Sequence, residues 1–197
     1  HTVNEPDKTD VFVLEMHPKD KLKYKVDQNY LTLIEKKAIL RYNLFGIPLR
    51  IKKKYYKSIY GPTLKNKSGF YAVRTAALFE IRALNQWWLM NKAKNFSEFY
   101  EILKMKALPG YNVGYADKND TIFYMSNGLI PKREKGYNWA HVVPGNTRKT
   151  LWTQNYDIEN LPQVLQPKSG YFYNANHTPF HSSGSGDNPD PKKFNEN

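Results

Sequence analysis

Few side chains of this sequence form a motif that is sufficient by itself to indicate a chemical activity. None of the five histidines makes an HxxxH or HExxH pair on an expected helix, because His177 and His181, which are four residues apart, lie in the irregular C-terminal part. The chain has no cysteine, which excludes a thiolate nucleophile, a disulfide framework and a Cys-ligated metal within these residues. It also has no Gly-x-Ser-x-Gly elbow and no Gly-rich phosphate loop. Single motifs therefore leave the function open, and the order of the segments has to carry the information.

The sequence predicts that the elements positioning any site are strands at the start of the chain, followed by helices. Residues 11–16 read as a buried strand, residues 30–42 as one or two strands, and residues 47–60 as a further strand pair that ends in a turn at Gly61-Pro62. Apolar segments on both sides of the polar turn 118–120 predict a β-hairpin.

Two helices are expected in the middle of the chain. Apolar residues recur at three- and four-residue spacing over residues 75–94, which predicts an amphipathic helix whose tryptophan and leucine stripe lies in the core. A second helix is expected over residues 97–107, with Ser97 as its N-cap and Phe99, Ile102 and Leu103 on its inner side. From residue 126 onward, prolines and glycines interrupt short apolar pieces, which predicts a long irregular traverse.

Positive charge dominates the 197 residues, with 30 basic against 18 acidic side chains and a net charge of +12. Residues 1–110 carry nearly all of the excess, in runs such as Lys19, Lys21, Lys23 and Lys25 and the cluster Lys52, Lys53, Lys54 and Lys57. The alternation of the first run favours a solvated strand face over a nucleic-acid footprint, because no base-reading motif accompanies it. A basic binding module for nucleic acid or an anionic surface remains the alternative function.

Six short segments follow one another in a characteristic order. They are Thr2-Val3 with Asp7 and Asp10, Tyr71-Ala72-Val73-Arg74 before the first helix, Asn112 before Tyr115-Ala116-Asp117, Ile130-Pro131-Lys132-Arg133, Val143-Pro144-Gly145, and Pro167-Lys168-Ser169-Gly170-Tyr171 leading to Asn174-Ala175-Asn176. This succession resembles the β subunit of the penicillin acylase family, whose members are N-terminal-nucleophile hydrolases. The resemblance extends to about residue 180.

The resemblance implies a fold and an activity. The fold is α+β, part of an αββα sandwich with antiparallel strands, two main helices and the irregular traverse. The activity is hydrolysis of a linear amide, in which an N-terminal Ser attacks the carbonyl and its own α-amine serves as the base. No Ser-Asn start matches here, so we expect His1 to correspond to a point inside the β subunit. The nucleophile, the α subunit and the rest of the β subunit would then lie outside this chain, and the segment alone is expected to be inactive.

The family's oxyanion hole carries over onto two positions. Asn112 matches the Asn whose side-chain amide donates to the oxyanion, and Val3 matches the residue whose backbone N–H is the second donor. By spacing alone, an Asn after Pro109-Gly110 would be a turn residue.

Arg133 matches an Arg that orients the nucleophile's amine and Asn112; the competing interpretation is a surface Arg in a Lys-Arg-Glu-Lys run. Asp7, Thr9 and Asp10 match part of a calcium site, with two carboxylates and a backbone carbonyl between them. Without further ligands, these three residues would form a solvated acidic loop. The chemistry itself requires no cofactor.

The resemblance also sets expectations for domains, partners and location. Residues 1–180 would form the partial acylase segment, and residues 181–197 a mobile polar tail. The expected partners are the absent subunit parts and a small-molecule amide, with neither nucleic acid nor a membrane span. Sheet strands left exposed would allow self-association. The protein would be periplasmic or secreted. A further alternative is a structural relic that keeps the fold without the activity.

Overall fold

The computed structural model describes residues 6–194, which form two compact units. The first unit takes in the chain up to Lys8, then Thr75–Arg133, and then the chain from Thr153 onward. The second unit takes in Thr9–Arg74 and Glu134–Trp152. Val3 lies outside the described residues.

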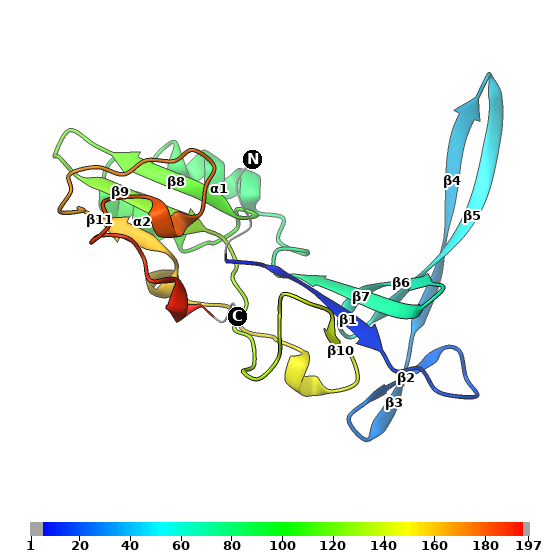
Figure 1. The fold of residues 1–197 in the computed structure, drawn as a ribbon. Helices are drawn as coiled ribbons and strands as arrows, with labels where there is room; N and C mark the ends of the chain where they lie inside the picture. Colours follow the sequence, from blue (N-terminus) through cyan, green and yellow to red (C-terminus); the bar gives the residue numbers. More distant parts are fainter. Residues whose placement is uncertain (1–5, 195–197) are drawn as a thin grey trace. The chain divides into compact units, whose positions relative to one another are not determined.

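A six-stranded sheet forms the second unit, in the order β10-β1-β7-β6-β5-β4 (Figure 1). Its strands are β1 (Thr9–Leu14), β4 (Ile34–Leu44), β5 (Ile47–Ser58), β6 (Gly61–Asn66), β7 (Gly69–Thr75) and β10 (Val143–Pro144). The run β4-β5-β6-β7 is antiparallel, whereas β1 and β10 pair in parallel through Phe12 and Val143. A separate hairpin joins β2 (Lys23–Val26) to β3 (Asn29–Thr32).

Alternation along the strands builds the core of this unit. Phe12 and Leu14 are buried on one side of β1, and Phe12 stacks on Tyr60 with 4.8 Å between ring centroids. In β2, Tyr24 and Val26 are buried, while Lys23 and Lys25, which alternate with them, lie on the more exposed face. The predicted lysine alternation is therefore confirmed from Lys23 on, where the strand begins.

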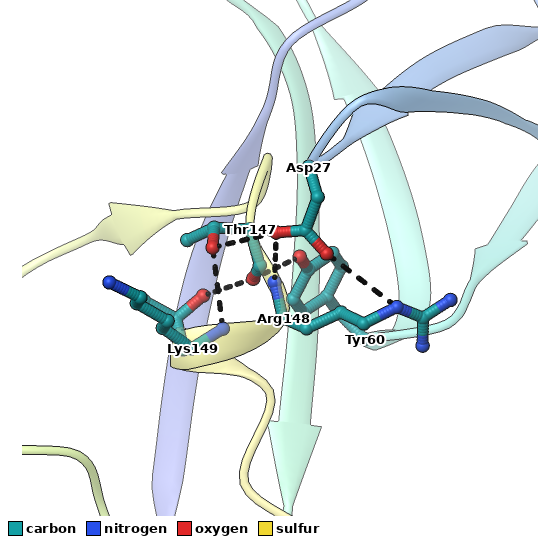
Figure 2. Close-up of polar contacts among 6 residues, drawn as sticks. Asp27, Tyr60, Thr147, Arg148 and Lys149 are labelled. Carbon is teal, nitrogen blue, oxygen red and sulfur yellow. Dashed lines mark hydrogen bonds and ion pairs between the residues drawn. The ribbon is translucent and has the colours of Figure 1, made fainter.

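A cluster of polar contacts joins the residues after β10 to the β2–β3 turn and to Tyr60 (Figure 2). The Asp27 carboxylate accepts hydrogen bonds from Thr147 Oγ1 at 2.9 Å and from the Arg148 N–H at 3.1 Å, and it pairs with the Arg148 guanidinium. The Tyr60 hydroxyl donates to Thr147 O at 2.7 Å. Burial raises the pKa of Tyr60 to about 12, which keeps this hydroxyl a donor at neutral pH.

Two predictions for this unit were wrong. Residues 47–60 hold one long strand, β5, and not a strand pair, because no turn-forming residue interrupts the alternation. The strand pairs with β4 across a two-residue turn at Phe45-Gly46, in which both φ angles are positive. Gly61-Pro62 begins β6, and the turn lies one step earlier, at residues 59–60.

The first unit packs two helices against a three-stranded antiparallel sheet in the order β11-β9-β8. The helices are α1 (Ala83–Met90) and α2 (Phe96–Leu103), and the strands are β8 (Tyr111–Ala116), β9 (Ile122–Asn127) and β11 (Gln163–Leu165). Phe99 and Leu103 of α2 meet Val113 and Phe123 in one buried cluster. The predicted β8–β9 hairpin and the α+β class are confirmed.

Both helices differ from the predictions in detail. The first is only eight residues long, because residues 76–79 form turns, and its tryptophans are exposed rather than buried, with Trp88 61% accessible. The second begins at Phe96, and its N-cap is Asn95, whose side chain accepts from the Glu98 N–H. Asn95 accepts this hydrogen bond two residues before the predicted cap, Ser97.

One buried polar link ties α1 to the rest of this unit. Gln86 is fully buried; its Oε1 accepts from the Ala107 N–H at 2.6 Å, and its Nε2 donates to Asn127 Oδ1 at 2.9 Å. Asn127 in turn donates to Leu103 O at 3.0 Å. These bonds join α1, the end of α2 and β9, so they set the position at which β8 begins, opposite Asn127.

The irregular C-terminal part is packed as far as Phe194. Four short 3-10 helices lie in the described traverse: Arg148–Thr150, Ile158–Asn160, Pro179–His181 and Pro191–Lys193. Ser182 is buried, and Phe194 joins the core cluster around α2. Most of the segment expected to be a mobile tail thus has defined contacts here. Among the described residues, no helix is both long enough and apolar enough to cross a membrane.

Replacing Gln86 tests the link that positions β8. Gln86→Leu leaves the Ala107 N–H and Asn127 Oδ1 without their Gln86 partners, at a cost of about 1–3 kcal/mol for each group. We expect roughly hundredfold faster hydrogen exchange at Ala107, measured by mass spectrometry on peptides that span residues 103–110. Gln154→Leu, the same change at an exposed position, should leave this exchange unaltered. Equal exchange in both variants would show that the link is dispensable.

Candidate active site

Asn112 is the second residue of β8 and not part of a turn, so the turn interpretation is wrong. The antiparallel register places it opposite Ser126 of β9. Alternation along β8 sends Val113 into the helix-side core, while Asn112 and Gly114 belong to the other face. A Cβ atom on Gly114 would lie 2.8 Å from the Phe172 ring, so glycine permits the C-terminal traverse to approach this face closely.

The Asn112 amide has two acceptors on that traverse. Its Nδ2 donates to Asn174 Oδ1 at 3.1 Å and to His177 O at 3.4 Å. Its own Oδ1 is buried and has no hydrogen-bond partner among the residues that the structure describes. The orientation of the amide is thus set by its N–H groups.

The turn at residues 174–177 is itself held in place. Asn174 Oδ1 also accepts from the Asn176 N–H, and Asn176 has a left-handed φ of 58°. His177 Nδ1 accepts from the Ala175 N–H, and its Nε2 lies 2.9 Å from His181 O. This pattern corresponds to the neutral tautomer with the proton on Nε2. Sequence reasoning quoted Asn174-Ala175-Asn176 as a motif but gave these residues no role, because only the fold brings them to β8.

An apolar pocket of about 250 Å³ lies on the helix side of β8. Trp87 and Met90 of α1, Phe99 of α2, and Tyr111 and Val113 are among its lining residues. By strand alternation, the Asn112 side chain belongs to the opposite face from Tyr111 and Val113. Asn112 and Gly114 nevertheless also line the pocket, so the pocket adjoins the part of β8 that carries the amide.

Arg133 is buried, with only 5% of its surface accessible, so the surface interpretation is wrong. Its Nη2 lies 3.3 Å from Asp7 Oδ2 in an ion pair. Asp7 also accepts from the Lys8 N–H at 2.7 Å. A buried guanidinium that is paired with a carboxylate can fix that part of the backbone. The predicted orientation of Asn112 by Arg133 stays a prediction.

The expected calcium ligands do not fit a cation on their own. Asp7 faces the Arg133 guanidinium, which repels a metal ion, and Asp10 Oδ2 accepts from Trp152 Nε1 at 2.7 Å. Thr9, whose backbone carbonyl was the third expected ligand, begins β1. Within residues 6–194, no group of three or more His, Asp or Glu side chains could hold a metal. The calcium site stays a prediction that needs ligands from elsewhere.

Comparison with known proteins gives the fold class first. The structure of a thermostable penicillin G acylase from Alcaligenes faecalis superposes with a TM-score of 0.77 and 22% identity, over 93% of this chain and 33% of that one. The α+β fold is therefore that of this acylase. The family follows from the sequence pattern of penicillin amidase, which matches residues 1–193, so the chain belongs to the penicillin amidase family.

Two curated relatives show how much of such a protein the chain spans. Penicillin G acylase of Escherichia coli is 37% identical over 100 residues, which are 51% of this chain and 12% of the relative. Acyl-homoserine lactone acylase PvdQ of Pseudomonas fluorescens is 25% identical over 140 residues, which are 66% of this chain and 18% of the relative. The matched part of the chain thus covers less than a fifth of the length of either relative.

Replacing Arg133 tests whether its pair with Asp7 supports the unit. Arg133→Met removes a buried cation and leaves Asp7 without it, which should lower the free energy of unfolding by about 1–3 kcal/mol. The matched control is Arg82→Met, because Arg82 forms an exposed ion pair with Glu80 and should contribute less than about 1 kcal/mol. Urea titration compares the two variants. A loss no greater for Arg133 than for Arg82 would contradict the supporting role.

Proposed function

We propose that the 197 residues act as part of a longer hydrolase that cleaves a linear amide into an acyl acid and an amine. Family membership supports the proposal, as do the names of the relatives, which are acylases. The nucleophile would be an N-terminal Ser outside this chain, and its own amine would be the general base. The α subunit and the remainder of the β subunit would complete the protein, which would be periplasmic or secreted.

The observation that carries the proposal is the anchored amide of Asn112. Acyl transfer needs donors that are already oriented toward the oxygen on which negative charge develops. Asn174 holds the Asn112 amide at 3.1 Å, whereas the contact with His177 O at 3.4 Å is long for a hydrogen bond. An oxyanion would compete well for the second N–H, because charged acceptors bind more strongly than a carbonyl. Asn112 would then donate to it while Asn174 keeps the side chain in place.

Two further residues complete this proposal. The Val3 backbone N–H would be the second oxyanion donor. Arg133, anchored by Asp7, would be a positioning residue that orients the nucleophile's amine and Asn112. Calcium, if bound, would have a structural role only and would take ligands from the rest of the protein.

Replacing Asn112 in the longer protein is the direct test. Asn112→Ala should lower kcat for a chromogenic acyl anilide by roughly 10²–10³, in line with the removal of one oxyanion-hole donor. Asn119→Ala, at an exposed turn position, should retain full activity. A loss of less than about tenfold for Asn112→Ala would remove this residue from the role. The 197-residue chain alone should show no turnover, and burst kinetics from it would overturn the assignment of the nucleophile to another part of the protein.

A further inference from the structure

The hairpin of β4 and β5 continues far beyond the strand beside it. Its register runs over eleven pairs, from Ile34–Lys57 at the base to Leu44–Ile47 at the tip. Only the last three residues of β5, from Tyr56 to Ser58, pair with β6. The outer part is therefore a two-stranded ribbon, which Figure 1 shows as two long blue and cyan arrows joined at one end. We call residues 36–55 the ribbon.

The tip of the ribbon is uncharged and apolar. Residues 42–49 read Tyr-Asn-Leu-Phe-Gly-Ile-Pro-Leu and contain no ionisable acid or base apart from the tyrosine. Leu44 and Ile47 are exposed, and Phe45 is 95% accessible. Isolated exposed apolar residues are common on protein surfaces, but a contiguous apolar end on an extended arm is typical of a contact site.

Phe45 is unfavourable for the ribbon's own folding on two counts. It stands at a left-handed φ of 49° in a two-residue turn, a position that suits Asn, Asp or Gly and not a bulky side chain. Gly46, with φ 85°, suits the same turn well. The Phe45 ring also gains almost no burial within the chain. Backbone strain together with full exposure points to a contact made outside the chain.

Cations surround the ribbon behind this tip. Seven exposed basic residues accompany one acidic residue, Glu35, at the base; they are Lys36, Lys37, Arg41, Arg50, Lys52, Lys53 and Lys54. Glu35 pairs with Lys54 at 3.1 Å. The pair Arg41–Arg50 comes three residues behind Leu44–Ile47, which at about 3.4 Å per residue is about 10 Å along the strands.

We propose that the ribbon docks on the surface of an anionic membrane, with its tip in the interface and its cations against the lipid headgroups. The apolar length matches the depth of about 5–10 Å to which interfacial elements insert. The paired strands satisfy each other's backbone groups, and the headgroup region hydrates their outer edges. Each cation near an anionic surface adds attraction, and Arg41 and Arg50, followed by Lys52 and Lys53, stand closest to the tip.

The segregation of charge favours a membrane over a nucleic acid. A polyanion groove favours cations along the whole contact, whereas this ribbon has an uncharged end, and exposed Ile39, Leu40 and Ile51 stand among the cations behind it. The same cations oppose pairing of the ribbon with a second copy of itself, because like charges would meet across the new interface.

Vesicle flotation with the longer protein tests the proposal independently of catalysis. The protein should bind vesicles of 30% phosphatidylglycerol in phosphatidylcholine at 0.1 M salt, and bind vesicles of phosphatidylcholine alone far more weakly. Phe45→Asn should weaken binding about tenfold or more through the loss of one inserted ring. It should also leave the hairpin folded, because Asn-Gly suits the turn. Lys52→Gln, Lys53→Gln and Lys54→Gln together should weaken binding about a hundredfold.

Phe79→Asn is the matched control, because Phe79 is also exposed but lies in the other unit. It should leave vesicle binding unchanged. No binding to the anionic vesicles, binding that ignores the lipid charge, or equal losses from Phe45→Asn and Phe79→Asn would each overturn the proposal. Binding to a short DNA duplex without vesicle binding would overturn it as well and would identify a nucleic-acid arm instead.

Discussion

The hydrogen-bonded pair Gln86–Asn127 is the constraint on which the first unit depends. Two fully buried amides cannot be left without partners, so α1, the connection after α2 and the end of β9 have to meet at one point. The register then starts β8 opposite Asn127 and places Asn112 opposite Ser126. With β8 fixed, the face that carries Asn112 and Gly114 receives the traverse that supplies Asn174 and His177.

Much of the fold could be predicted because local patterns set it. The β8–β9 hairpin follows from apolar alternation on both sides of a polar turn, and α2 follows from the spacing of Phe99 and Leu103. The first helix could not be predicted in the same way. A stripe of leucine and tryptophan shows that a surface is apolar, but it does not show which partner covers that surface. Within this chain, most of the stripe is exposed. The residue of α1 that is fully buried is Gln86, which an apolar pattern passes over.

The candidate site, like the fold, could be predicted from the sequence only in part. The sequence pointed to Asn112 and Arg133 through a resemblance of segment order, and the structure places the first in a strand and the second in a buried ion pair. The sequence could not identify Asn174 or His177 as partners of Asn112, because more than sixty residues separate them from it along the chain. The alternation of the first lysine run favours a solvated strand face, and another part of the charge excess is concentrated on one exposed ribbon. Composition records the amount of charge, but only the strand register shows that its cations stand behind an apolar tip.

The central claim is that Asn112 donates to an oxyanion while Asn174 holds its side chain. A crystal structure of the longer protein, with its nucleophile in a covalent tetrahedral adduct, tests this claim most directly. The account predicts Asn112 Nδ2 at about 2.7–3.1 Å from the negatively charged oxygen, with the Asn174 bond kept and the His177 bond released. An adduct whose oxygen is held by other donors, with Asn112 still bonded to both Asn174 and His177, would contradict it.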